Sequence, residues 1–252
     1  MRAALPLLLL LALAAAAPAQ TVDLRVRAGV DALSGAYADG RSVSAQLTAQ
    51  RPGGWARLDV AAEDRFDQRA LVYGAAAARD LGSRYVVVGS VGSSTGGLVH
   101  PRLTASLGVG RKWGAERRLV TMATVGFVDA RDVHRDLTAT GEAVLYGDGL
   151  IAQVGARATL SQPGDALGYG GHVSVTLPTA SGRAFRARLA AGRESYLLVE
   201  PAPVDVSFRS GEGWVEWEEP VGSRWAVSAR AGIYANPYYS RVGLLTGIRH
   251  RF

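Results

Sequence analysis

A histidine and a serine stand two positions apart, at His172 and Ser174. Side chains two apart on a β-strand lie on one face, so the imidazole could take the hydroxyl proton and create a nucleophile for acyl transfer. Such a pair also needs a polar group that orients the histidine, but the next predicted strand carries Arg186 and Arg188 in that region. We therefore expect a protein that is not an enzyme, with hydrolysis by His172 and Ser174 as the alternative.

Side chains of alternating polarity continue through the rest of the chain. From Val22 to Leu33 every second side chain is apolar, and Asp23, Arg25 and Arg27 lie between them. Because successive strand side chains point to opposite faces, this pattern predicts strands with one apolar and one polar face. The fourteen candidate strands begin near Val22, Arg41, Trp55, Gln68, Arg84, Arg102, Arg118, His134, Leu150, Tyr169, Arg183, Val206, Arg224 and Tyr239.

These segments have the length that a tilted strand needs to cross a bilayer, about ten residues. Unpaired backbone groups cost several kcal/mol in lipid, so a sheet in a membrane must close. The prediction is all-β, a transmembrane antiparallel β-barrel of about 14 strands over residues 20–252. Because the segments from Gln68, Arg118 and Val206 alternate poorly, 12 strands are the alternative. The chain also ends on an aromatic residue on the apolar face, Phe252, as outer-membrane barrels do.

The first 19 residues have the pattern of a cleaved signal peptide. Arg2 precedes an apolar run over residues 5–16, and small residues at 17–19 follow it. The apolar run is shorter than the roughly 20 residues that a membrane-spanning helix needs. We expect cleavage between Ala19 and Gln20, and a protein that resides in the outer membrane.

Short turns occur at every second connection, and mostly longer links lie between them. In outer-membrane barrels the short turns face the periplasm, which places both termini there when the strand count is even. Aromatic residues beside these turns are expected to form a girdle at the periplasmic interface, where a ring lies in lipid and its polar edge reaches water. The girdle residues are Tyr85, Trp113, Trp217, Trp225 and Phe252.

The composition excludes several other classes of protein. The formal net charge is +6, but the basic residues are spread along the chain rather than gathered into a basic run, so we expect no nucleic-acid partner. The chain has no cysteine and therefore no disulfide framework or thiolate metal site. We expect no cofactor. The expected partners are outer-membrane lipid and the barrel-assembly machinery, which would act through the C-terminal strand of a monomer.

The chain resembles a known family in several places. The signal peptide, Gly29 and Asp31 before the Ser34-Gly35 break, the alternating turn spacing and the terminal Arg249-His250-Arg251-Phe252 are similar to the YaiO family of outer-membrane β-barrel proteins. The resemblance implies residence in the outer membrane and a monomeric barrel without a well-defined biochemical activity. It supplies no catalytic or binding residues.

The polar face of each strand should line the barrel interior, with arginine in excess of acidic residues. The residues expected there are Arg25, Arg27, Arg57, Asp59, Glu63, Arg102, Asp136, Glu142, Arg157, Arg186, Arg188, Glu194, Glu216, Glu218, Arg230, Arg249 and Arg251.

Three functions are compatible with such an interior. An ion-pair network that fills the lumen favours a structural, envelope-associated barrel with at most a narrow arginine-lined pore. An arginine surplus would instead favour a small-solute channel that prefers anions. The third is lipid hydrolysis, because His172 and Ser174 resemble the His-x-Ser pair of outer-membrane phospholipases and lipid A deacylases. Those enzymes carry the pair on the lipid-facing side, whereas the alternation here sends both side chains inward.

Overall fold

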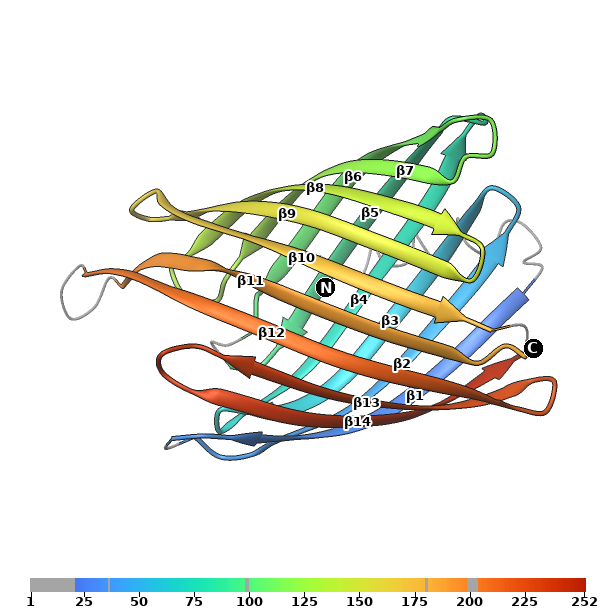
Figure 1. Ribbon diagram of the computed structural model, residues 1–252. Coiled ribbons are helices and arrows are strands. Elements are labelled where there is room, and N and C mark those ends of the chain that lie inside the picture. The colour runs from blue at the N-terminus through green and yellow to red at the C-terminus, as the bar shows by residue number, and fades with distance from the viewer. Residues whose placement is uncertain (1–20, 36, 98–99, 180, 199–203) are drawn as a thin grey trace.

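The computed structural model describes residues 21–35, 37–97, 100–179, 181–198 and 204–252, which form a closed antiparallel barrel (Figure 1). The expected signal peptide and its cleavage site between Ala19 and Gln20 lie outside the described residues. The described residues form no helix with the length and hydrophobicity of a membrane span. The strands are β1 (Thr21–Leu33), β2 (Gly40–Arg51), β3 (Gly54–Arg65), β4 (Gln68–Leu81), β5 (Tyr85–Thr95), β6 (Leu103–Trp113), β7 (Leu119–Asp129), β8 (Arg135–Gly147), β9 (Leu150–Gln162), β10 (Ala166–Pro178), β11 (Ala184–Leu198), β12 (Val204–Val221), β13 (Trp225–Ala235) and β14 (Ser240–Arg251).

Each strand pairs with its neighbours in sequence, and β1 closes the barrel against β14. In this closing pair Arg25 lies opposite Arg249, and the backbone N–H of Phe252 donates to the carbonyl of Val22 at 2.9 Å. The prediction of fourteen strands is confirmed, and the alternative of 12 is wrong.

The three segments that alternate poorly are complete strands, β4, β7 and β12. In β4 the alanines at 75–78 stand on both faces, and Ala75 and Ala76 are both buried. In β7 the lumen-facing side chains include Val120 and Met122, which are apolar. Small or apolar residues on both faces weaken the polar alternation, and pairing with two neighbouring strands keeps these segments in the sheet.

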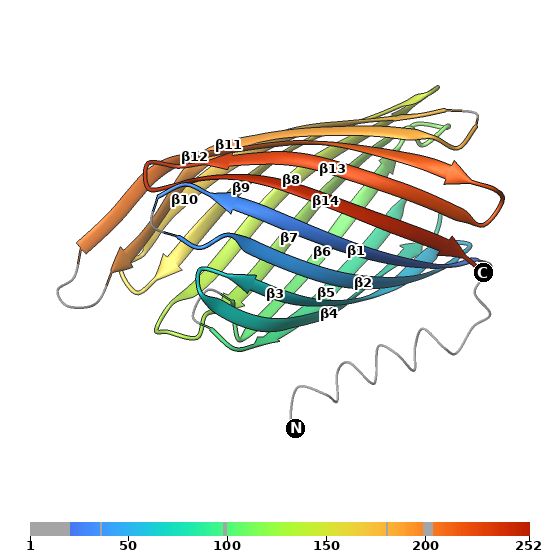
Figure 2. The same ribbon diagram turned by 90° about the horizontal axis from the view of Figure 1, so that it is seen from below.

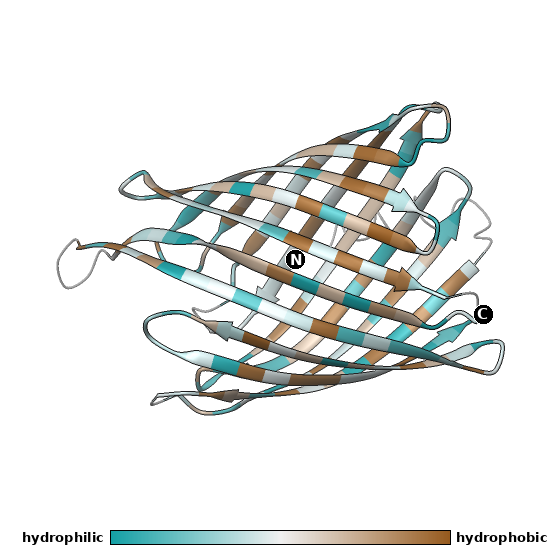
Figure 3. Ribbon diagram, in the orientation of Figure 1, coloured by the Kyte–Doolittle hydropathy of each residue, from teal (hydrophilic) through white to brown (hydrophobic). Residues whose placement is uncertain are grey.

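Hydrophilic and hydrophobic residues alternate along the strands of the barrel wall (Figure 3). Large apolar side chains project outward and remain exposed, for example Val125 at 64% and Leu189 at 66%. Soluble proteins rarely expose so continuous an apolar surface, whereas a bilayer covers it. Charged and hydroxyl side chains alternate with these residues and face the lumen.

The barrel has two distinct ends (Figure 2). At the terminus end, where β1 begins and β14 ends, the turns contain glycines with positive φ, a conformation that glycine adopts without strain. These are Gly53, Gly82, Gly114, Gly149, Gly182 and Gly222. At the opposite end, the loop end, β3 and β4 are joined by the two-residue turn of Phe66 and Asp67, with φ of 53° and 58°. Positive φ at both central residues is the geometry of a tight hairpin.

Candidate functional site

Two glutamates of β12 are buried inside the barrel. Glu216 is 2% exposed and Glu218 is 5% exposed. Both face the lumen, where they meet guanidinium groups from four other strands. The arginines that contact them are Arg25, Arg27, Arg186, Arg230 and Arg249. We call these seven residues the Glu216 network.

Glu216 receives hydrogen bonds from both adjacent strands. Arg186 on β11 and Arg230 on β13 lie directly opposite it in register. The Nη1 atom of Arg186 donates to Oε1 at 2.7 Å, and the Nε atom of Arg230 donates to Oε2 at 2.7 Å. The guanidinium of Arg230 also lies 4.1 Å from the ring centroid of Trp214, so a cation–π contact fixes it from a second direction. Arg27 reaches Oε2 from β1 at 3.4 Å.

Glu218 links the same network to the closing strands. The Nη2 atoms of Arg25 and Arg249 donate to its two carboxylate oxygens at 2.8 Å and 3.0 Å. Arg249 also donates to Asp23 of β1 at 3.1 Å. Charged side chains of β1, β12 and β14 are therefore joined across the closing pair.

The position of the network follows from small residues between its members. In register, Ser228 of β13 and Gly247 of β14 lie between Glu218 and Arg27. Neither fills the lumen, so the long arginine side chains of β1 can cross over β14. A buried carboxylate is costly unless charged donors surround it, and here each glutamate has several.

Other residues expected in the interior form separate pairs. Arg57 donates to Asp59 of the same strand at 2.8 Å. Glu63 lies 3.8 Å from the Nε2 atom of His100. Arg57, Asp59 and Glu63 belong to β3, and His100 lies between β5 and β6, so the structure divides the expected cluster into the Glu216 network and smaller groups.

The inner wall carries nearly equal numbers of basic and acidic residues among the residues described. By strand register, eleven arginines and one lysine face eleven carboxylates, so the expected arginine excess is reduced to a near balance. Four carboxylates that were not expected in the interior account for this near balance. These are Asp23, Asp31, Asp80 and Glu212, and their strand parity was the signal that could have identified them.

Open space remains beside the network. A central cavity of about 390 Å³ is bounded by Arg25 and Arg27 on one side and by Ser90, Gly92 and Thr104 of β5 and β6 on the other. A second cavity of about 330 Å³ lies toward the terminus end and shares Arg25 with the first. The network therefore narrows the described lumen from one wall without filling it.

His172 and Ser174 face the lumen, as the alternation of β10 requires. The Oγ atom of Ser174 donates to Gln153 at 3.4 Å, and the Nε2 atom of His172 lies 3.5 Å from Glu142. The described structure contains no hydrogen bond between the two residues. The pair therefore lacks the contact through which a base activates a nucleophile.

The five expected girdle residues all lie on the outer wall toward the terminus end. Their exposed fractions run from 40% for Trp113 to 66% for Phe252. Trp225 contacts His250 with ring centroids 4.3 Å apart and the rings tilted by 56°, and His250 contacts Phe252 at 4.5 Å between ring centroids. Tyr85 begins β5 and Trp217 lies near the end of β12.

Aromatic residues also connect the loop end, which the sequence patterns did not indicate. Tyr37, Phe66 and Tyr239 contact one another with ring centroids 5.2 to 5.6 Å apart, although they come from three separate connections. A second series joins Tyr238, Phe208, Tyr196 and His134. Rings from hairpins far apart in sequence meet only when the barrel closes, so the sequence gives no local signal for them.

His134 is held by hydrogen bonds at this end. Its Nδ1 atom lies 2.6 Å from Asp132, and its Nε2 atom lies 2.7 Å from the carbonyl oxygen of Leu197. Burial favours the neutral ring, but the bonds to Leu197 and Asp132 outweigh it and raise the pKa of His134. Burial of Asp132 is likewise outweighed by hydrogen bonds from His134, which lower the pKa of the Asp132 carboxyl.

Comparisons with known proteins agree with this architecture. A family model described as YaiO membrane beta barrel domain matches residues 22–197. Among solved structures, Omp33 of Acinetobacter baumannii is similar with a TM-score of 0.55 and 13% identity, covering 93% of this chain and 100% of that chain. A bacterial polysaccharide outer membrane secretin has a TM-score of 0.54 and 10% identity, covering 92% of this chain and 98% of that chain. The translocator domain of the autotransporter NalP from Neisseria meningitidis has a TM-score of 0.52 and 12% identity, covering 100% of this chain and 95% of that chain. Among curated proteins, none matches this chain.

Proposed function

Because the chain belongs to the YaiO family of membrane β-barrels and is an integral outer-membrane protein, we propose that it forms a narrow, arginine-lined pore for small hydrophilic solutes. The observation that carries this proposal is the central cavity between Arg25 and Arg27 and the wall of β5 and β6. Solutes would pass beside the Glu216 network rather than through it.

The expected selectivity follows from the residues along this passage. The central cavity is lined by Arg25, Arg27 and Arg57 but by one carboxylate, Asp59. Although the whole inner wall is nearly balanced in charge, this stretch is positive. Rings and clusters of basic residues favour anions in pores, so a moderate anion preference is expected.

Planar-bilayer recording of the purified protein tests the pore. We expect small stepwise conductances and a reversal potential in a KCl gradient that indicates anion preference. Replacing both Arg25 and Arg27 with serine should enlarge the conductance and reduce that preference. The matched control is Arg69→Ser, because the Arg69 side chain projects from the outer face and is 88% exposed.

A sealed structural barrel is the second candidate, and the near balance of inner-wall charges favours it. A folded protein that inserts into the bilayer and gives no conductance steps would support this candidate and overturn the pore. In either case the protein is not an enzyme in our proposal, since His172 and Ser174 are not hydrogen-bonded to each other. It acts as a monomer, because a closed sheet offers no free strand edge.

A further inference from the structure

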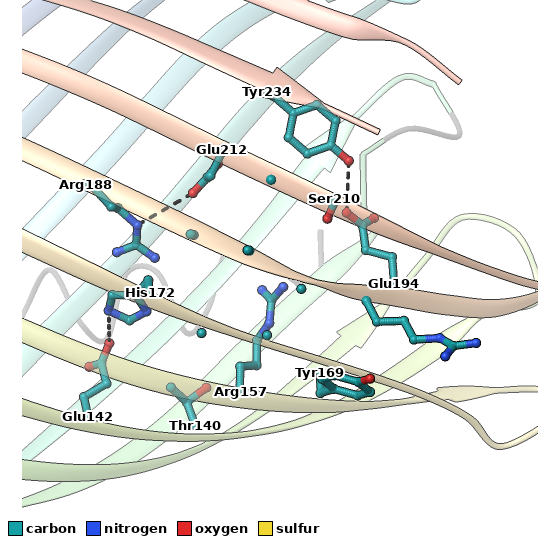
Figure 4. A pocket seen from close by; sticks show the side chains of 17 residues that line it. Thr140, Glu142, Arg157, Tyr169, His172, Arg188, Glu194, Ser210, Glu212 and Tyr234 are labelled. Atoms are coloured by element: carbon teal, nitrogen blue, oxygen red, sulfur yellow. Dashed lines mark hydrogen bonds and ion pairs between the residues drawn. The ribbon is translucent and has the colours of Figure 1, made fainter. Parts of the chain in front are cut away.

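A cavity of about 340 Å³ lies on the other side of the barrel from the central cavity, among β8 to β13 (Figure 4). Gly170 on β10 and Gly192 on β11 lie opposite each other and present no side chain to this cavity. A Cβ atom at Gly170 would come within 3.1 Å of the Ala191 carbonyl oxygen, so a larger residue fits poorly at this position of the wall.

Three nitrogen-bearing side chains that face the lumen line this cavity from adjacent strands. A fourth lining residue, Arg193, pairs in register with the outward-facing Tyr169 and donates from Nε to Ser207 at 2.6 Å. Arg157 on β9, His172 on β10 and Arg188 on β11 are offset diagonally in register, and each faces the lumen. In Figure 4 the guanidinium of Arg157 extends into the space between these strands.

Among the described residues, no carboxylate lies within 4.0 Å of Arg157, unlike the arginines of the Glu216 network. It is exposed to the lumen and makes no hydrogen bond or ion pair in the described structure. The other two donors are also incompletely used. The Nε atom of Arg188 lies 3.6 Å from Glu212, beyond hydrogen-bond length, and the buried Nε2 atom of His172 has no hydrogen-bond partner in the part of the chain that the structure describes.

The same cavity also contains acceptors, which lie beside these donors. Glu142, Glu194 and Glu212 all line it, and among the described residues each has one carboxylate oxygen in a hydrogen bond or ion pair and one without. Free cationic donors and free carboxylate oxygens therefore face the same space. Such a site is close to neutral overall and offers both unsatisfied donors and unsatisfied acceptors.

We propose that this cavity binds a small zwitterion, an α-amino acid, with its carboxylate on Arg157 and Arg188 and its ammonium group toward the glutamates. A simple anion would meet three carboxylates, and a simple cation would meet two arginines. A zwitterion satisfies both sets, and guanidinium groups suit carboxylates because of their paired donors. Access to the cavity rests on the proposed open lumen.

Ligand binding to the full chain in detergent can be measured by saturation-transfer NMR. The probes are L-alanine, lactate, which lacks the ammonium group, and alaninamide, which lacks the carboxylate. We expect L-alanine to bind at least about tenfold more tightly than either analogue, because each lacks one charged contact. The variant Arg157→Gln should weaken L-alanine binding about tenfold or more, and Arg157→Lys should weaken it less.

The control is Arg135→Gln, which removes a half-exposed rim arginine that pairs with Asp129 outside the cavity. Unaltered heat-dependent migration on detergent gels would show that each variant is folded. Equal binding of lactate and L-alanine would overturn the zwitterion, and unchanged binding in Arg157→Gln would overturn the site. Because the NMR measurement needs no ion flow, binding without conductance would contradict the pore alone, whereas conductance without binding would contradict this site alone.

Discussion

Arg27 lies directly opposite Gly247 in the closing strand pair, and a Cβ atom on residue 247 would come within 2.7 Å of the Arg27 Cγ atom. It would also lie 3.0 Å from the Val26 carbonyl oxygen. The glycine thus provides the space through which Arg27 passes toward Glu216.

The variant Gly247→Ala should therefore displace Arg27 and destabilise the barrel by about 1–3 kcal/mol, the usual cost of an overpacked site. Urea unfolding in lipid vesicles, followed by tryptophan fluorescence, measures this change. The matched control is Gly141→Ala, because no atom lies within 4 Å of a Cβ placed there. Equal stability of the two variants would contradict a packing role for Gly247.

Glu216→Gln should destabilise the protein more strongly, by about 3–5 kcal/mol, because it leaves buried guanidinium groups without their counter-charge. The loss of one negative charge should also increase any anion preference of the lumen. The same unfolding measurement and bilayer reversal potentials test both effects. Glu116→Gln is the control, since the Glu116 side chain is 72% exposed, and it should change neither quantity.

The strand alternation predicted most of the fold because lipid and lumen impose opposite polarity on the two faces of every strand. It placed Arg25, Arg186 and Glu216 on the inner wall but could not show which of them meet. Those contacts depend on side chains that cross intervening strands over small residues such as Gly247. The cavity beside Arg157 was beyond prediction for the same reason, since an unpaired charge becomes visible only when all its neighbours are placed.

The contact between His134 and Asp132 should depend on pH. The pKa of His134 is raised in the folded protein, so its contribution to stability is complete below the unfolded pKa, about 6.5, and is lost as the pH rises through the folded value. The pKa of Asp132 is lowered, so its contribution is lost only as the pH falls below about 3.9 and through the folded value. The loop end should therefore be most stable between about pH 4 and 6.5.

Hydrogen exchange of the β7–β8 loop across this pH range measures the effect. Protection should decrease above neutral pH in the unmodified protein and be low and nearly independent of pH in His134→Gln. A pH profile that is the same in both proteins would show that the loop does not depend on this histidine.

The orientation in the membrane can be tested by cysteine labelling, because the sequence contains no cysteine that would react in the background. Val133 lies in a connection at the loop end and is 60% exposed, and Asp148 lies in a turn at the terminus end with a side chain that is 93% exposed. A large, membrane-impermeant maleimide should label Val133→Cys on intact cells. It should label Asp148→Cys only after the outer membrane is permeabilised. The reverse result would place the termini outside.

Deleting Phe252 should reduce the yield of folded barrel in the membrane. The deletion removes an exposed ring at the terminus end and the hydrogen bond from its backbone N–H to the Val22 carbonyl. Phe252→Tyr keeps both and should assemble normally. Gel migration before and after boiling distinguishes folded from unfolded protein, and an unchanged folded fraction after the deletion would argue against a role of this residue in assembly.

The Glu216 network also bears on how the barrel could come apart. Every strand pairing except β1 with β14 joins neighbours in sequence, so this pairing alone holds the first and last strands together. Arg25 and Arg27 on β1 extend past β14 to Glu218 and Glu216, which are 193 and 189 residues away in sequence. These ion pairs in the lumen therefore also hold β1 to the C-terminal strands. Lateral opening toward the bilayer would have to separate buried ion pairs as well as one ladder of backbone hydrogen bonds.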